Sequence, residues 1–216
     1  PASDSGAAGA AARRRNALER LAALRDELHL DAELVYVEAR SVRQGLHDTA
    51  RARSADLLVV GASRYDVIYR DLVGDDAREV LENAPCAIAV APVGYSSRRG
   101  PLRTIGVAYD DSSESARTLV VAKDIALDCH AKVSVFQTVS GLQPHDPVHL
   151  EDSIEYAECG DPAQELGRYG QSVDLLVLGA DKHGPGARWL GQGTVRRLAD
   201  EPPCPLLVLP RAQPTS

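Results

Sequence analysis

Ala55–Pro92 reads ADLLVVGASRYDVIYRDLVGDDAREVLENAPCAIAVAP, and Val173–Pro210 reads VDLLVLGADKHGPGARWLGQGTVRRLADEPPCPLLVLP. The two segments align without a gap, at a constant offset of 173 − 55 = 118 residues. An ungapped internal match of this length indicates duplication of a folded unit. Any function must therefore suit a unit that occurs twice. The identical pairs include Asp56/Asp174, Gly61/Gly179, Arg78/Arg196, Pro85/Pro203 and Cys86/Cys204.

Each copy has the pattern of a strand–helix–strand unit. It opens with a short apolar run, Leu57–Val60 or Leu175–Leu178, of the kind found in strands buried on both faces of a parallel sheet. A second apolar run, Ala87–Ala91 or Leu206–Leu209, closes the copy. Between them lies a short amphipathic segment that ends at a proline, which predicts a helix.

Further elements flank each copy. In the first half the pattern predicts helices over Ala11–His29 and Arg43–Ala52, with a strand over Glu33–Glu38 between them. Alternating strands and helices predict an α/β fold with a mainly parallel sheet. In the second half we expect strands over Thr104–Tyr109, Lys132–Val139 and Ile154–Cys159, a helix capped by Asp111 and Glu114, and a short helix from Ala163.

The composition excludes several classes of function. The net charge is −7 and the isoelectric point is near 5.4, which argues against nucleic acid as a partner because phosphate backbones need a basic surface. No apolar run is long enough to span a membrane, and the first residues lack the apolar core of a signal peptide. We therefore expect a cytoplasmic chain. Its four cysteines show no metal-binding spacing, so we expect reduced thiols and no metal site.

The motifs DLLVVG…APCAIAVAP, DLLVLG…PPCPLLVLP, IGVAYDDSSESA and the GDPA at Gly160–Ala163 resemble the universal stress protein family in a tandem arrangement. The resemblance implies two modules, each an open, mainly parallel, doubly wound five-stranded sheet with helices on both faces. It implies a first module over residues 1–94, a linker over 95–101 and a second module over 102–216. It also implies dimer-like packing of modules, no catalytic chemistry and, in many members, ATP binding.

ATP-binding members carry a loop of Gly, two residues, Gly, nine residues, Gly and then Ser or Thr. Such glycines allow close backbone approach to phosphates, and a helix N-terminus offers free N–H groups. The second copy matches this pattern in part, with a Gly-rich loop that includes a cation and ends at a threonine. The resemblance also places an acidic residue and a strand-end backbone group near the nucleotide. The expected binding residues are Asp110, Val139, Gly179, Lys182, Gly191, Gly193 and Thr194.

The first copy departs from this pattern. Arg64 replaces the second glycine and Asp75 replaces the hydroxyl residue, so a carboxylate stands where a phosphate would lie. A carboxylate there repels a triphosphate and is also a good helix cap. The first half has no equivalent of Thr104–Val139, so we expect the missing strands to come from upstream sequence or from a partner chain. The segment from Gly141 to Ser153 is short where family members usually place a helix.

The sequence therefore predicts a non-enzymatic stress-response or regulatory module that binds ATP or a related adenine nucleotide in its second half. The alternative is the cytosolic regulatory domain of a larger protein, such as a membrane transporter, acting by protein contact without nucleotide. An adenylating or electron-transfer enzyme of the related α/β class is a third hypothesis. Self-association is expected through module packing or through the sheet edges at Ala87–Ala91 and Leu206–Leu209.

Overall fold

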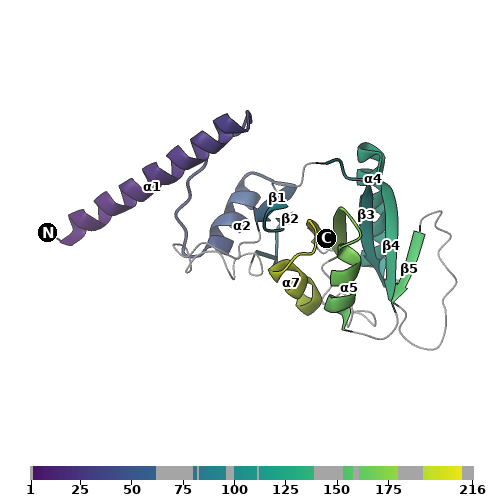
Figure 1. Cartoon of the computed structure of the whole chain (residues 1–216). Coiled ribbons are helices and arrows are strands. Elements are labelled where there is room, and N and C mark those ends of the chain that lie inside the picture. Colours follow the sequence, from purple (N-terminus) through teal and green to yellow (C-terminus); the bar gives the residue numbers. More distant parts are fainter. Residues whose placement is uncertain are drawn as a thin grey trace. The chain divides into compact units, whose positions relative to one another are not determined.

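A computed structural model of the chain describes residues 2–61, 80–81, 83–95, 100–110, 112–138, 153–157, 161–179 and 192–210 (Figure 1). Its contacts divide the chain into two compact units, Pro1–Gly45 and Leu46–Ser216. The domain boundaries expected at residues 94 and 102 stay a prediction. Each unit is described by itself below.

The first unit consists mainly of helix α1 (Ala2–Glu27). Alanine and arginine, both strong helix formers, dominate its sequence. The helix ends where His29 adopts a left-handed backbone conformation, with a φ of 53°. The predicted helix over Ala11–His29 is confirmed, although it begins earlier. Its leucine stripe is exposed rather than buried: Leu21, Leu24 and Leu28 are 42%, 53% and 56% exposed.

The predicted strand over Glu33–Glu38 is wrong, because residues 30–39 have no regular secondary structure. The apolar alternation is real, but Val35 and Val37 are exposed. A strand needs a neighbouring strand to satisfy its backbone N–H and C=O groups. The first half of this chain has no counterpart of the strands that such a segment would join. Helix α2 (Val42–Ala52) follows, as predicted.

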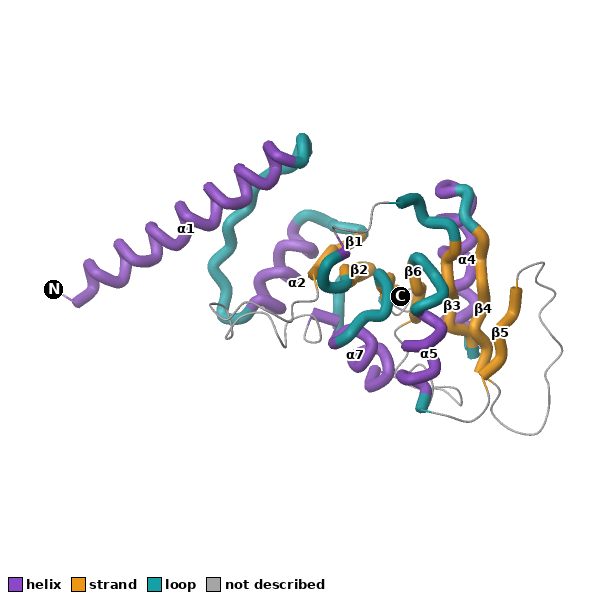
Figure 2. The backbone as a smooth tube through the Cα atoms, in the orientation of Figure 1, coloured by secondary structure: helices purple, strands orange, loops and turns teal. Residues whose placement is uncertain are grey.

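The second unit is built on one seven-stranded sheet, in the order β1-β2-β7-β6-β3-β4-β5 (Figure 2). Six strand runs agree closely with the predicted ones, and the end of the predicted strand Ile154–Cys159 lies outside the described residues. Every neighbouring pair is parallel except β2 and β7, which are antiparallel. The strands are β1 (Leu57–Gly61), β2 (Ala87–Ala91), β3 (Thr104–Tyr109), β4 (Lys132–Thr138), β5 (Ser153–Ala157), β6 (Leu175–Gly179) and β7 (Leu206–Leu209).

The β2–β7 pairing joins the two copies of the repeat. Ile88 lies opposite Val208 and Val90 lies opposite Leu206, and all four side chains are buried. The two runs predicted to be exposed sheet edges are therefore interior strands paired with each other. On the other side of β7, the strands β6, β3, β4 and β5 complete a parallel five-stranded group, as the family resemblance implies.

Helices cover both faces of the sheet. On one face, α4 (Ser113–Cys129) places Leu119, Ala122 and Ala126 against the strands, and we call this the α4 face. On the opposite face, α5 (Pro162–Gly170) and α7 (Gln192–Asp200) pack against each other over the same sheet. We call this the α5 face. The fold is thus an α/β fold with a mainly parallel sheet.

Helix α2 is tied to the sheet unit by a buried histidine. His47 is 6% exposed, and its Nε2 donates to the carbonyl oxygen of Val80 at 2.8 Å. Val80 is fully buried in the core of the α5 face, together with Ile88 and Val90. The hydrogen bond therefore satisfies a carbonyl that water cannot reach.

Replacing this histidine is expected to destabilise the fold. His47→Ala leaves the Val80 carbonyl buried without a partner, which lowers the free energy of unfolding by about 1–3 kcal/mol. Asp48→Ala is the matched control on the same helix, because Asp48 is exposed and its ion pair with Arg51 lies at the surface. That variant should change stability by less than about 0.5 kcal/mol. Urea denaturation measures both values, and equal effects would contradict the role of the buried bond.

Candidate functional site

The sheet has a topological switch point between β3 and β6. The chain leaves β3 through α4 on one face and leaves β6 toward α7 on the other face. β3 and β6 are nevertheless parallel neighbours, with Val107 opposite Val177. In open α/β sheets, ligands bind in the crevice at the carboxyl ends of the strands at such a point. Two of the predicted site residues, Asp110 and Gly179, stand at this edge.

Asp110 follows directly after β3. One of its carboxylate oxygens, Oδ1, accepts a hydrogen bond from the backbone N–H of Ser112 at 3.2 Å. Its own N–H donates to the Oγ of Ser115 at 3.4 Å. The residue therefore shapes the turn from β3 into α4. The other carboxylate oxygen has no partner within the described part of the chain, so it is available to a ligand at this edge.

Helix α4 begins differently from the prediction. Ser112 is the N-cap, and its Oγ accepts from the backbone N–H of Ser115 at 3.0 Å. The capping pair expected from Asp111 and Glu114 is thus wrong, since the hydroxyl of Ser112 occupies the cap position. Ser112 has the extended backbone that an N-cap requires, and serine is among the preferred residues there. α4 connects two parallel strands, so its N-terminus lies at the carboxyl edge of the sheet.

Gly179 ends β6 where α4 passes close to the strand. A side-chain Cβ at this position would stand 3.0 Å from the Oγ1 of Thr118 and 3.7 Å from the Cβ of Glu114. The Thr118 hydroxyl is held there, since it donates to the carbonyl oxygen of Glu114 at 2.8 Å. Gly179 is therefore needed for the close packing of β6 and α4, in addition to any role toward a ligand.

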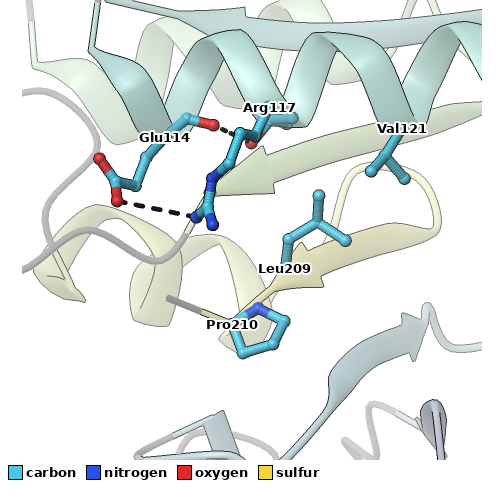
Figure 3. Close-up of a pocket in the computed structure, with 7 residues that line it drawn as sticks. Glu114, Arg117, Val121, Leu209 and Pro210 are labelled. Carbon is cyan, nitrogen blue, oxygen red and sulfur yellow. Dashed lines mark hydrogen bonds and ion pairs between the residues drawn. The ribbon is translucent and has the colours of Figure 1, made fainter. Parts of the chain in front are cut away.

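A cavity of about 250 Å³ lies beside Gly179 on the α4 face (Figure 3). Arg117 extends from α4 into this space, and its guanidinium lies 3.7 Å from the Glu114 carboxylate. The sequence analysis did not predict Arg117 as a site residue. Its position in the first turns of the helix that follows β3 could have indicated that it lies near the carboxyl edge of the sheet. The cavity thus combines a cation with apolar walls. It is lined by Glu114, Arg117, Thr118, Val121, Gly179, Leu209 and Pro210.

Gly193 and Thr194 lie in the first turn of α7. Since α7 connects the parallel strands β6 and β7, its N-terminus also lies at the carboxyl edge of the sheet. A Cβ at Gly193 would meet nothing within 4 Å. Thr194 is only 9% exposed, and its hydroxyl has no hydrogen-bond partner among the described residues. A buried hydroxyl without a partner calls for an explanation, and a bound ligand is one.

The helix α7 is fixed to the neighbouring helix α5 by an ion pair. Arg197 Nη1 lies 2.6 Å from Asp161 Oδ2 and donates to Oδ1 at 2.9 Å. Asp161 is also the N-cap of α5, where Oδ1 accepts from the N–H of Ala163, and Pro162 occupies the first helical position. Within the GDPA motif, Asp161 to Ala163 therefore have a structural role. The hydrogen bond from Arg197 is the main cause that holds the pKa of Asp161 below its ordinary value.

Three of the expected binding residues, Val139, Lys182 and Gly191, lie outside the described residues. So do Arg64 and Asp75 of the first copy.

The cysteines show no metal chemistry in the described part of the chain. Cys86 and Cys204 are buried free thiols, and Cys129 is an exposed one. Burial, followed by the nearby charge of Asp56, raises the pKa of the Cys86 thiol. The described residues contain no group of three or more potential metal ligands. None of the described helices combines the length and apolar character needed to span a membrane.

Known proteins resemble this chain in sequence and in fold. Residues 1–92 match the profile of the universal stress protein family. A putative universal stress protein from Pseudomonas aeruginosa UCBPP-PA14 matches with a TM-score of 0.61 at 18% identity, over 89% of this chain and 77% of the other. A universal stress protein from Archaeoglobus fulgidus DSM 4304 matches with a TM-score of 0.65 at 14% identity, over 95% and 78%. No curated protein matches the sequence.

Residues 1–92 therefore resemble the universal stress protein family in sequence. The sheet has the fold of the solved universal stress proteins. This fold agrees with the switch point at β3 and β6, where the candidate site lies.

The Asp161–Arg197 ion pair makes stability depend on pH. Because the folded-state pKa of Asp161 is lowered, its contribution is present above about pH 4, the unfolded-state pKa, and is lost as pH falls through the folded-state pKa. Asp161→Asn keeps an N-cap oxygen but removes the charge. We expect this variant to be less stable than the wild type at pH 7, and the difference should shrink as pH falls through the folded-state pKa of Asp161. Denaturation across this range tests the sign, and a constant difference would contradict it.

Proposed function

We propose that this protein is a non-enzymatic stress-response module that binds ATP or a related adenine nucleotide at the carboxyl edge of β3 and β6. The observation that carries the proposal is the buried hydroxyl of Thr194 in the first turn of α7, which has no hydrogen-bond partner among the described residues. It lies next to Gly193, whose surroundings are open. Exposed N–H groups, a helix dipole and a free hydroxyl at one helix start suit a phosphate group.

Other residues at the carboxyl edge of β3 and β6 suit the ribose and the negative charge of a nucleotide. The free oxygen of Asp110 is a good acceptor for the hydroxyl groups of a ribose. Arg117 carries a positive charge beside Gly179 and can shift from its long contact with Glu114, which at 3.7 Å is a weak surface pair. By family resemblance, Gly179, Lys182, Gly191 and the backbone at Val139 complete the site.

The first experiment is a calorimetric titration of ATP with magnesium into the wild-type chain and Gly193→Asp. The new side chain has room at position 193, and a carboxylate near the N-terminus of a helix is stabilised by the helix dipole. The variant should therefore fold normally. It should also repel a phosphate by about 1–4 kcal/mol and weaken binding by tenfold or more. Gly193→Asn is the matched control, since it adds the same volume without charge. Absence of binding to the wild type, or equal binding to Gly193→Asp, would overturn the proposal.

A second variant pair tests Asp110. Asp110→Asn keeps an oxygen that can accept from the Ser112 N–H, whereas Asp110→Ala removes it. If the carboxylate binds the ribose, both variants should weaken ATP binding by about tenfold or more, as expected for loss of a hydrogen bond to a charged acceptor. Only Asp110→Ala should also lower the thermal midpoint. Unchanged affinity in Asp110→Asn would assign this residue to the turn alone.

A further inference from the structure

The cavity beside Gly179 is formed by the first half of α4 together with the ends of β6 and β7 (Figure 3). It lies on the α4 face of the sheet. The candidate phosphate site at Gly193 and Thr194 belongs to α7, which packs on the α5 face. The ends of β6 and β7 therefore lie between the cavity and the start of α7, so the cavity has walls of its own.

The cation in this cavity is held less tightly than its counterpart on another helix. Helices α4 and α5 each carry a glutamate in the first turn and an arginine three residues later. On α5, Arg168 Nη1 donates to Glu165 Oε1 at 2.6 Å. On α4, Arg117 Nη2 lies 3.7 Å from Glu114 Oε1, which is beyond hydrogen-bond distance. The same spacing thus gives a closed ion pair on α5 and an open one on α4.

Glu114 is stabilised without Arg117. Its other carboxylate oxygen, Oε2, accepts a hydrogen bond from the Oγ of Ser113 at 2.8 Å. A carboxylate in the first turn of a helix is also stabilised by the helix dipole. Arg117 has no hydrogen bond within the described part of the chain, and its side chain is 46% exposed. Its guanidinium is therefore available to an anion in the cavity.

The other walls of the cavity are mainly apolar. Val121 lies one turn after Arg117 on α4, and Leu209 and Pro210 lie at the end of β7, beside the guanidinium (Figure 3). All three are half-buried. A ligand that covers them removes apolar surface from water, which favours binding. The cavity therefore suits a molecule with one charged end and one apolar end.

Size and charge narrow the class of ligand. A cavity of about 250 Å³ has room for roughly eight non-hydrogen atoms, since a water molecule in the liquid takes about 30 Å³. The single guanidinium offsets one negative charge, and a second one would lie close to the Glu114 carboxylate without a cation of its own. The planar guanidinium also matches a carboxylate in shape and can bind it through two hydrogen bonds.

We propose that this cavity binds a small aliphatic carboxylate with a chain of about six carbon atoms. The carboxylate pairs with Arg117, and the chain lies against Val121, Leu209 and Pro210. The site does not depend on the proposed nucleotide site. A nucleotide that also uses Arg117 would compete with the carboxylate for this one cation.

The probe is hexanoate, titrated into the full chain without nucleotide and followed by methyl NMR. We expect saturable shifts of the Val121 and Leu209 methyl signals, with a dissociation constant in the millimolar range or below, as ligands of this size allow. Hexanol lacks the charge and acetate lacks the apolar chain, so each should bind at least about tenfold more weakly. Absence of saturable shifts at these methyl groups, or equal binding of hexanol and hexanoate, would overturn the proposal.

Two variants test the role of the cation. Arg117→Gln should weaken hexanoate binding by about tenfold or more, as expected for loss of hydrogen bonds between charged groups. Arg168→Gln is the matched control, because it removes an arginine with the same spacing from glutamate that does not line the cavity. Both side chains are exposed, so both variants should keep a thermal midpoint near that of the wild type. Equal hexanoate binding by the two variants would overturn the proposal.

Discussion

The antiparallel pairing of β2 with β7 is the contact on which the rest of the sheet unit depends. Either strand alone would end its half of the sheet with a row of unpaired backbone groups. Their pairing satisfies these groups and brings Ile88, Val90, Leu206 and Val208 into one buried cluster. That cluster also contains residues of α5 and α7. The position of α7, and with it the candidate phosphate site, is therefore secured partly by the first copy of the repeat.

The two copies act as an internal comparison, because one sequence pattern lies in two environments. In the second copy, Asp174, Val177 and Gly179 each contact β3 or α4, or the turn that leads to them. In the first copy the described residues provide no such neighbours for Asp56, Val59 and Gly61. The retained pattern shows that the first copy is built for the same surroundings.

Sequence reasoning located most strands and helices because buried parallel strands are short, apolar and bounded by glycine or proline. It failed at Glu33–Glu38, where alternation is correct but no neighbouring strand is present to pair with. It also chose Asp111 and Glu114 as caps, whereas Ser112 takes that position. Both errors concern local signals that are compatible with more than one structure, and only long-range contacts select between them.

For the candidate site, the resemblance to the universal stress protein family selected Asp110, Gly179 and Thr194. The hydrogen bonding and the burial of these residues could not be predicted in this way. Motif matching does not show that one carboxylate oxygen of Asp110 accepts from the Ser112 N–H. Nor does it show that Thr194 is buried with no hydrogen-bond partner among the described residues. Nor does it bring Arg117 to Gly179, since helix and strand are far apart in the chain.

The sequence by itself determined the duplication, the order of strands and helices, and the mainly parallel α/β class, because these follow from local periodicity and turn chemistry. The tertiary structure alone decided that the two copies share one sheet, that their pairing is antiparallel, and that β1 is left at an edge. Those outcomes depend on which backbone groups find partners at long range. Periodicity along the chain carries no information about that choice.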